Sequence, residues 1–430
     1  MTLAMKKNNR RAFLGTMTAG VAASCLGPLR DAQGAFHEAL DALPTDMDFA
    51  DASELYSLGE GVTYFNHASI GTMPRVVQAA RRTYLDLCET NPWLYMWGPA
   101  WGEKVEETRR VVAEFIGSTP QELAIVHNTT EAFNTLASGL PLGPGDEVLF
   151  SSMNHAGASV CWNHHAPQRG FTVRRFEFPI ERADRMTADE IVARYLEQIK
   201  PETRMLVIPH IDNMVGLRYP VKQLAAAARR LGVQYIAVDG AQSIGMIPVD
   251  VNDLGVDFYA TSAHKWLQSP KGLGLLHVKK EIQDEVRAMW VTWGQGRWGG
   301  TARVYEDYGT RNRAELLTLE DCVRFQMKLG LEARQSHFKA LHRHLHQRVE
   351  ETKGLAWRSP QTWEDGCSLV AIEVEGHASG DVFDHLYEQH GFVFRAFGGD
   401  LNTMRISLNV MNTTDEIDRF VQLIKDEILA

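Results

Sequence analysis

The sequence predicts an α/β protein in which helices cover a mostly parallel β-sheet, followed by a smaller α+β domain. Short apolar, β-rich runs alternate with helix-length amphipathic segments over residues 61–310, a pattern typical of βαβ crossovers. Beyond residue 311 the pattern changes to a long helical stretch and a few strands. The length of 430 residues fits two or three domains.

The expected elements of the large domain begin with a helix over 102–116. Seven strands are expected, at residues 123–127, 147–151, 172–178, 205–209, 233–239, 257–261 and 273–278. The smaller domain is expected to contain helix over 314–350, strands near 368–374 and 404–408, and a closing helix after Thr414. In such a fold ligands bind outside the carboxyl ends of the parallel strands, so the chemistry is expected there.

The charge balance favours a small-molecule ligand. The chain has 44 Lys and Arg against 54 Asp and Glu, a net charge of −10. This argues against nucleic acid or an anionic membrane as the main partner, because phosphate contact needs a basic face. Residues 1–34 carry a net charge of +4, so the remaining chain carries −14.

The basic N-terminal segment resembles a twin-arginine signal peptide. Arg10 and Arg11 precede a weakly apolar run, 15–29, that is too short and polar to suit a transmembrane helix. Ala32 and Gly34 place small residues at −3 and −1 of a cut after Gly34. A basic tail and a loosely matched lipoprotein site are the alternatives. We expect a periplasmic or secreted protein with a signal peptide over 1–34, an arm over 35–60, a large domain over 61–310 and a small domain over 311–430.

The cysteines do not indicate a metal site, and none is expected. Those beyond the leader contain no CxxC pair and are Cys88, Cys161, Cys322 and Cys367. Their spacing leaves disulfide pairing open, and burial as small apolar residues is favoured.

Two strand ends carry the residues that suggest catalysis. Asp239 ends an apolar strand, where it is either a helix cap or a functional carboxylate. Lys265 follows 26 positions later, after the next strand and beside His264. A partly desolvated lysine at such a position can be neutral and attack a carbonyl carbon.

These motifs resemble the class V group of fold-type-I pyridoxal 5′-phosphate (PLP) enzymes, which includes cysteine desulfurases and isopenicillin N epimerase. The resemblance extends over nearly all of residues 61–425. It implies the fold-type-I transferase fold, PLP as cofactor and Lys265 as the Schiff-base lysine. It also implies that Asp239 pairs with the pyridinium nitrogen, so that the ring acts as an electron sink, and that Gln242 bonds the phenolic oxygen.

The resemblance also implies a phosphate site. Thr129 and Thr130 follow a strand and open an apolar helix, where a plain N-cap is the alternative interpretation. In the family this loop holds the phosphate, with Ser262 and His264 on the other side. Thr310 matches a threonine that reaches the phosphate of the neighbouring subunit, which implies a homodimer with shared active sites.

Further positions match the family around the substrate. His155 would stack on the pyridoxal face, and Asn213 would lie near the phenolic oxygen and the substrate carboxylate. Arg405 would clamp the α-carboxylate by a bidentate pair. His67 belongs to a segment that lines the substrate pocket, although a structural hydrogen bond is the commoner role for such a histidine. The expected catalytic residues are Lys265, Asp239 and His155.

Two features distinguish the chain within that group. A desulfurase cysteine would lie shortly before Arg405, but residues 391–404 contain none, so desulfuration is disfavoured. Transamination, epimerisation, decarboxylation and C–S lysis remain open. Tryptophans occur in two loop regions, and we expect these loops to form a wide aromatic pocket for a bulky or peptidic amine. They are Trp93, Trp97, Trp101, Trp293 and Trp298.

The sequence therefore predicts an exported PLP enzyme of the aminotransferase or epimerase type. It would act, through an external aldimine, at the amino group or α-carbon of an amino acid or amine-bearing metabolite. One alternative is a periplasmic siderophore-tailoring enzyme that modifies a glutamate group, as in pyoverdine maturation, which this chain resembles in organisation. Another is a binding protein of the PLP fold without turnover.

Overall fold

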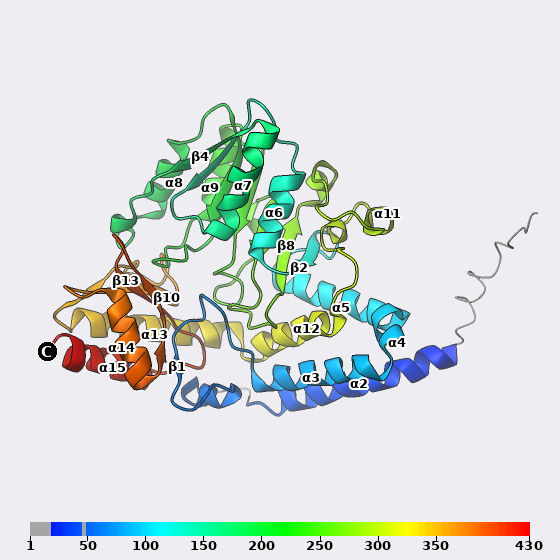
Figure 1. Cartoon of the computed structure of the whole chain (residues 1–430), viewed down its shortest axis with the longest axis horizontal. Coiled ribbons are helices and arrows are strands. Elements are labelled where there is room, and N and C mark those ends of the chain that lie inside the picture. The colour runs from blue at the N-terminus through cyan, green and yellow to red at the C-terminus, as the bar shows by residue number, and fades with distance from the viewer. Residues whose placement is uncertain (1–18, 45–48) are drawn as a thin grey trace, which may run out of the picture.

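A computed structural model describes residues 19–44 and 49–430, and a seven-stranded sheet formed by these residues is the centre of the large domain (Figure 1). Its strand order is β2-β8-β7-β6-β5-β3-β4. The strands are β2 (Leu123–Val126), β3 (Glu147–Ser151), β4 (Thr172–Phe176), β5 (Thr203–Pro209), β6 (Tyr235–Asp239), β7 (Phe258–Thr261) and β8 (Gly274–Val278). All neighbours are parallel except β8, which is antiparallel to β2 and β7. The predicted seven-stranded, mostly parallel sheet is confirmed.

Helices cover both faces of this sheet because its strands are apolar on both sides. In β5, Met205 and Val207 pack into one core cluster, whereas Leu206 and Ile208 pack into another. This alternation is the two-residue period of a strand buried on both faces. The helices between the strands are α6 (Thr129–Gly139), α7 (Ala156–Arg169), α8 (Ala188–Leu196), α9 (Val221–Arg230) and α10 (Val251–Leu254).

The small domain is built on a four-stranded antiparallel sheet of order β12-β13-β10-β9. Its strands are β9 (Leu355–Trp357), β10 (Leu369–Val374), β12 (Arg395–Phe397) and β13 (Thr403–Ser407), with helices α14 (Ser379–His390), α15 (Thr414–Leu423) and a π-helix η5 (Ile424–Ile428). The expected helical region over 314–350 consists of α12 (Arg313–Lys328) and α13 (Leu331–Glu350). Gly330 separates them with φ of 76°, a left-handed conformation that favours glycine.

The first strand, at the start of the range expected for the large domain, pairs with a strand of the small domain. Strand β1 (Thr63–Tyr64) runs parallel to β11 (Phe392–Val393). Phe65, the next residue, lies fully buried in the core cluster of the small domain. The small domain is therefore built from residues 63–65 together with the C-terminal part of the chain.

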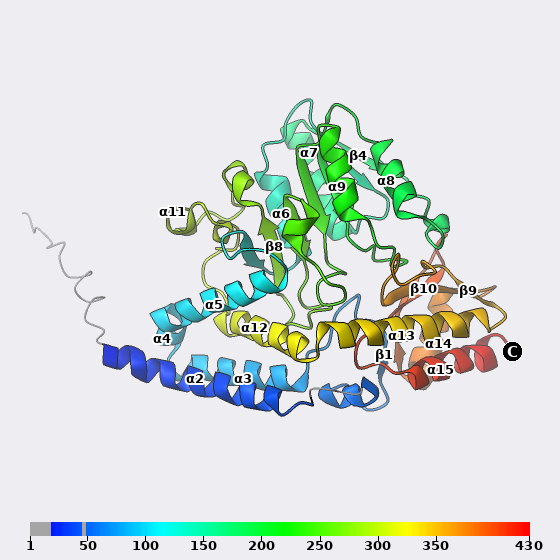
Figure 2. The same cartoon turned by 180° about the vertical axis from the view of Figure 1, so that it is seen from behind.

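The helix α2 (Ala19–Asp41) lies along α3 (Arg75–Thr90), beneath α12 (Figure 2). Leu29, Ala32, Phe36 and Leu40 form its buried stripe. The expected cut after Gly34 falls inside this helix, between side chains that pack in the core. The twin arginines lie outside the described residues, and none of the helices in the described part of the chain is long and apolar enough to cross a membrane.

The first tryptophan region folds as two helices rather than one. Helix α4 (Pro92–Trp97) ends at Gly98, and α5 (Pro99–Phe115) follows directly. A Cβ on Gly98 would approach the carbonyl oxygen of Leu94 to 2.2 Å, so this turn requires glycine. Two short helical segments, α11 (Gly294–Trp298) and η4 (Ala302–Tyr305), form the second region.

Candidate active site

A cavity of about 390 Å³ lies where the carboxyl ends of the central strands face the small domain. It brings together residues that are more than 270 positions apart in the sequence, such as Thr129 and Arg405. The predicted site residues that line it are Thr129, Thr130, His155, Asn213, Asp239, Gln242, Ser262, His264, Lys265 and Arg405. Their convergence follows from the parallel strands, whose carboxyl ends meet at one edge, and from Arg405 on β13, which reaches the same cavity from the small domain.

Asp239 and Lys265 both line this cavity and influence each other electrostatically. Asp239 ends β6, is 5% exposed, and accepts a hydrogen bond from the backbone N–H of Ala241 at 3.0 Å. Burial raises the pKa of Asp239, against the opposing effects of the Ala241 N–H and the Lys265 charge. Burial also lowers the pKa of Lys265 to about 8, although Asp239 acts in the other direction. The amine of Lys265 is therefore available in its neutral, nucleophilic form near neutral pH.

Gln242 is held beside this pair by two hydrogen bonds. Its Nε2 donates to the carbonyl oxygen of Ala68 at 3.0 Å, and its Oε1 accepts from the indole of Trp266 at 2.7 Å. The side-chain amide is thereby fixed in orientation, with one N–H of Nε2 left for a ligand.

The start of α6 forms an anion site. The Asn128 side chain caps this helix by accepting from the backbone N–H of Glu131 at 2.9 Å. The Thr129 and Ser262 hydroxyls lie 2.9 Å apart, and the Nδ1 atom of His264 is buried without a hydrogen-bond partner among the described residues. Hydroxyls, an unpartnered imidazole nitrogen and a helix N-terminus together suit a phosphate group.

Arg405, in strand β13, also lines the cavity. It is 4% exposed and donates from Nη1 to the Asn213 carbonyl at 2.9 Å, and from Nη2 to Asn66 Oδ1 at 3.2 Å and to the Ser69 hydroxyl. Burial, with the nearby charge of Arg395, lowers its pKa to about 10. No carboxylate of the described chain forms an ion pair with it, so this buried guanidinium suits a ligand carboxylate.

His155 lies at the exposed mouth of the cavity and caps α7. Its Nδ1 accepts a hydrogen bond from the backbone N–H of Gly157 at 3.1 Å. Burial of the ring and the Lys265 charge lower its pKa, whereas Asp239 raises it. A ring so placed is available to cover a planar cofactor.

His67 is not brought into the cavity, although its neighbours Ala68 and Ser69 line it. The ring is fully buried against Tyr64 and Trp266, and neither nitrogen has a hydrogen-bond partner in the described part of the chain. Burial lowers its pKa to about 3, so the ring is neutral. Its position in the structure is that of a core side chain.

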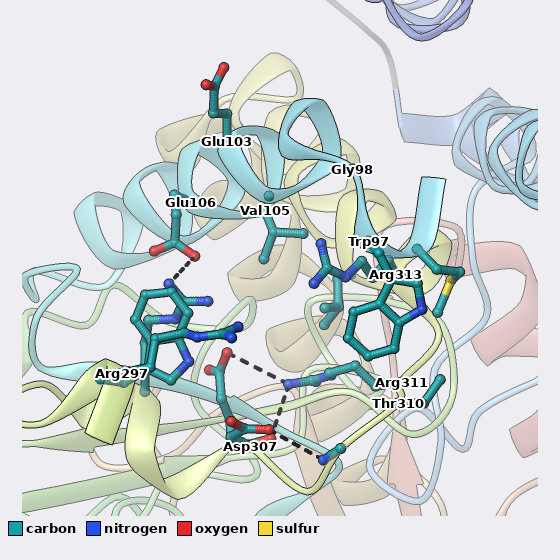
Figure 3. Close-up of a pocket in the computed structure, with 17 residues that line it drawn as sticks. Trp97, Gly98, Glu103, Val105, Glu106, Arg297, Asp307, Thr310, Arg311 and Arg313 are labelled. Atoms are coloured by element: carbon teal, nitrogen blue, oxygen red, sulfur yellow. Dashed lines mark hydrogen bonds and ion pairs between the residues drawn. The ribbon is translucent and has the colours of Figure 1, made fainter. Parts of the chain in front are cut away.

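Thr310 also lies outside the cavity of its own chain. It is exposed and lines a second pocket of about 460 Å³, together with Trp97 and Trp298 (Figure 3). Trp101 is buried in the core. Of the five tryptophans expected to form one aromatic pocket, two therefore line a pocket, and it is separate from the cavity of Lys265.

The lining residues that were not predicted as site residues include two with large side chains, Arg395 and Phe397. They lie on β12, a three-residue edge strand without a motif of its own. The sequence feature that could have identified them is an arginine and an aromatic residue two positions apart, just before the strand of Arg405.

The residues present fit PLP. The buried Asp239 carboxylate suits a ring nitrogen that must stay protonated, Lys265 suits covalent attachment, and the start of α6 suits the phosphate. The unpartnered nitrogen of His264 is a polar atom for which the described protein offers no partner.

Comparison with known proteins gives the same assignment. The aminotransferase class-V family model matches residues 62–420. Isopenicillin N epimerase of Amycolatopsis lactamdurans is 29% identical over 397 residues, which cover 88% of this chain and 98% of the relative. Cysteine desulfurase of Haloferax volcanii is 32% identical over 347 residues, which cover 74% and 78%.

Solved structures share the fold. Apo cysteine desulfurase from Thermococcus onnurineus NA1 has a TM-score of 0.76 at 22% identity, covering 88% of this chain and 98% of that one. A lysine variant of C-DES with glycine covalently linked to its PLP cofactor has a TM-score of 0.77 at 22% identity, covering 88% and 99%. The chain therefore belongs to the class V aminotransferase family and is a PLP-dependent enzyme.

Proposed function

We propose that the enzyme moves the α-proton of an amino acid, or of an amine-bearing metabolite, in a reaction of the aminotransferase or epimerase type. The observation that carries this proposal is the buried amine of Lys265 in one cavity with Asp239 and Arg405. PLP, when bound, supplies the electron sink that makes the α-proton acidic. The protein's part is to place that proton beside a base.

Each residue of the cavity has its own role in the proposed reaction. Arg405 binds the α-carboxylate and thereby fixes the α-carbon in place. Lys265, with its pKa lowered to about 8, accepts and returns the proton. Asp239 keeps the proton on the ring nitrogen, and Gln242 donates to the phenolic oxygen. His155 covers the ring face from the mouth of the cavity.

The position of the cysteines supports proton transfer over desulfuration. Cys88, Cys161, Cys322 and Cys367 are free and buried, and no cysteine in the described part of the chain lines the cavity. The Cys367 thiol donates to the Gly216 carbonyl at 3.4 Å, and burial raises its pKa to about 12. A protonated, enclosed thiol cannot attack substrate sulfur.

We propose a homodimer in which Thr310 contributes to the partner's phosphate site. The support is that Thr310 is exposed and lies outside its own cavity. Exposed apolar side chains lie near Thr310, namely Trp97, which lines the same pocket, and Trp290, whose ring centre is 6.4 Å from that of Tyr308. Such a patch is typical of a protein interface.

We also propose export by the twin-arginine pathway, with processing N-terminal to Leu29. The support is the paired Arg10 and Arg11 in the sequence, and the packing of Leu29 and Ala32 in the core. A cut after Gly34 would remove both apolar side chains.

A second candidate function is modification of a glutamate group on a larger metabolite, such as a siderophore. It is favoured by the exposure of His155 and Arg395 at the cavity mouth, which leaves room for a substrate that extends outward. A binding protein without turnover is the remaining alternative, and the experiment below separates it from an enzyme.

The proposal is tested with purified holoenzyme and an amino-acid panel in deuterated water. We expect α-deuterium exchange, together with loss of the cofactor's visible absorption in Lys265→Ala. Exchange without keto acid identifies an epimerase, and keto acid with an aminated cofactor identifies an aminotransferase. Absorption that persists unchanged in Lys265→Ala, or an absence of exchange and of product across the panel and its peptide derivatives, contradicts the proposal.

A further inference from the structure

The cavity contains a second arginine that the proposed reaction does not use. Arg395 on β12 lies directly opposite Arg405 on β13 in the antiparallel register. Side chains of directly opposed residues project from the same face of a sheet, with Cβ atoms about 5 Å apart. Both arginines therefore serve the same end of the cavity, and both line it.

The two guanidinium groups are held differently. Arg405 is buried and makes three hydrogen bonds to Asn213, Asn66 and Ser69. Arg395 is exposed, and its side chain makes no ion pair or hydrogen bond within the described residues. The Cζ atoms of Arg395 and Arg405 lie 5.7 and 5.5 Å from the ring centre of Phe397. One fixed and one free cation thus flank the same aromatic ring.

The charge at this end of the cavity is not balanced by the protein. Asp239 is the one carboxylate among the described lining residues, and in the proposed function it pairs with the ring nitrogen of the cofactor. Like charges directly opposite each other in a sheet destabilise it. The repulsion also contributes to the lowered pKa of Arg405. One α-carboxylate can neutralise Arg405, but it leaves Arg395 uncompensated.

We infer that Arg395 binds a second, distal carboxylate, so that the substrate is a dicarboxylic amino acid or a peptide-like amine with a distal acid group. This rests on the proposed function, in which Arg405 takes the α-carboxylate. The fixed guanidinium binds the part common to all amino acids. The free guanidinium, at the mouth, adjusts to the length of the side chain.

The test compares L-glutamate with L-glutamine, which match in size and differ in the distal charge. Binding of the two amino acids to the holoenzyme is measured from the change in the cofactor's absorption. Binding of glutarate, a dicarboxylate, and of butyrate, a monocarboxylate, is compared from the shift of the thermal midpoint of unfolding. We expect wild type to bind glutamate about tenfold more tightly than glutamine. Arg395→Gln should remove this difference without weakening glutamine, and Arg395→Lys should restore part of it.

Arg419→Gln is the matched control. Arg419 is an exposed arginine of the same domain, with its Cζ atom 5.3 Å from the ring centre of Phe392, but it does not line the cavity. The Arg419→Gln variant should leave the preference for glutamate over glutamine unchanged. A wild-type protein with an intact cofactor spectrum but equal affinity for glutamate and glutamine overturns this inference alone. An Arg395→Gln variant that binds the cofactor more weakly but still prefers glutamate to glutamine has the same consequence. A protein that takes up no cofactor overturns the proposed function as well.

Discussion

The indole N–H of Trp266 donates to Oε1 of Gln242 at 2.7 Å, and this contact, together with the bond from Nε2 to the Ala68 carbonyl, fixes the orientation of the Gln242 amide at the cavity. We predict that Trp266→Phe lowers cofactor affinity, because the freed amide can rotate and present its oxygen to the phenolic oxygen. The orphaned Oε1 and the lost volume should also cost about 1–3 kcal/mol of stability. Equilibrium dialysis of PLP and urea unfolding measure the two effects.

Trp162→Phe is the control for that variant. Trp162 is also fully buried and donates its indole N–H to the Ala158 carbonyl at 3.0 Å, but Ala158 does not line the cavity, whereas Gln242, the partner of Trp266, does. It should destabilise the protein comparably and leave cofactor affinity unchanged. Equal losses of cofactor affinity in both variants would contradict a specific role for the Trp266 contact.

Cofactor capture by the apoenzyme should rise with pH through about 8. The pKa of Lys265 is lowered to about 8 by burial, and only the neutral amine attacks the cofactor's aldehyde. Asp239 opposes that lowering, so Asp239→Asn should move the profile to lower pH. Stopped-flow absorbance at a series of pH values measures the midpoint. A midpoint that stays near 10 would show that Lys265 is not desolvated.

Arg109→Met should destabilise the protein by about 3–5 kcal/mol, because it removes the close ion-pair partner of the buried Glu306 and leaves that carboxylate only a longer ion pair, of 3.7 Å, with Arg311. Arg109 is fully buried and bonds Glu306 at 2.6 Å, and Glu306 in turn accepts from the backbone N–H of Ile125 at 2.6 Å. The neighbouring Arg110→Met removes only an exposed pair with Glu114 and should cost about 0–1 kcal/mol. Urea unfolding gives the free energy of unfolding of both variants. Similar losses of stability in the two variants would contradict the prediction.

Chains that begin at residue 27 or at residue 35 should differ in stability. Only the longer chain retains Leu29 and Ala32, and burial of a leucine side chain contributes about 1.5–3 kcal/mol. The thermal midpoint of the shorter chain should therefore be lower. In the full chain, Leu29→Ser should destabilise the protein whereas Arg30→Ser, at an exposed neighbour, should not. N-terminal sequencing of exported protein should find its first residue before Leu29.

Subunit mixing tests the shared active site. Thr310→Val should lower cofactor affinity, and Lys265→Ala should abolish turnover. In a mixed dimer the Lys265→Ala subunit would supply Thr310 to the intact Lys265 of its partner. Mixing the two variants should therefore restore turnover at one of the two sites. Activity that stays at the level of the separate variants would argue that Thr310 serves no partner.

Most of the cavity could be predicted from the sequence because parallel strands bring their carboxyl ends to one edge. Asp239 and Lys265 follow adjacent strands, so their proximity required only the order of the sheet. Arg395 could not be predicted in this way, because its role depends on the register between two short strands. His67 shows the opposite case, since its segment reaches the cavity through Ala68 and Ser69 while the imidazole itself points into the core.

The pairing of β1 with β11 affects how the protein is made. Thr63 emerges early from the ribosome, but its partner Phe392 is synthesised 329 residues later. Asn66, which orients Arg405, belongs to the same early segment. A nascent chain therefore cannot complete its substrate-binding end until almost the whole sequence has been translated. Incomplete chains consequently lack the means to bind substrate, so that acquisition of activity coincides with the end of synthesis.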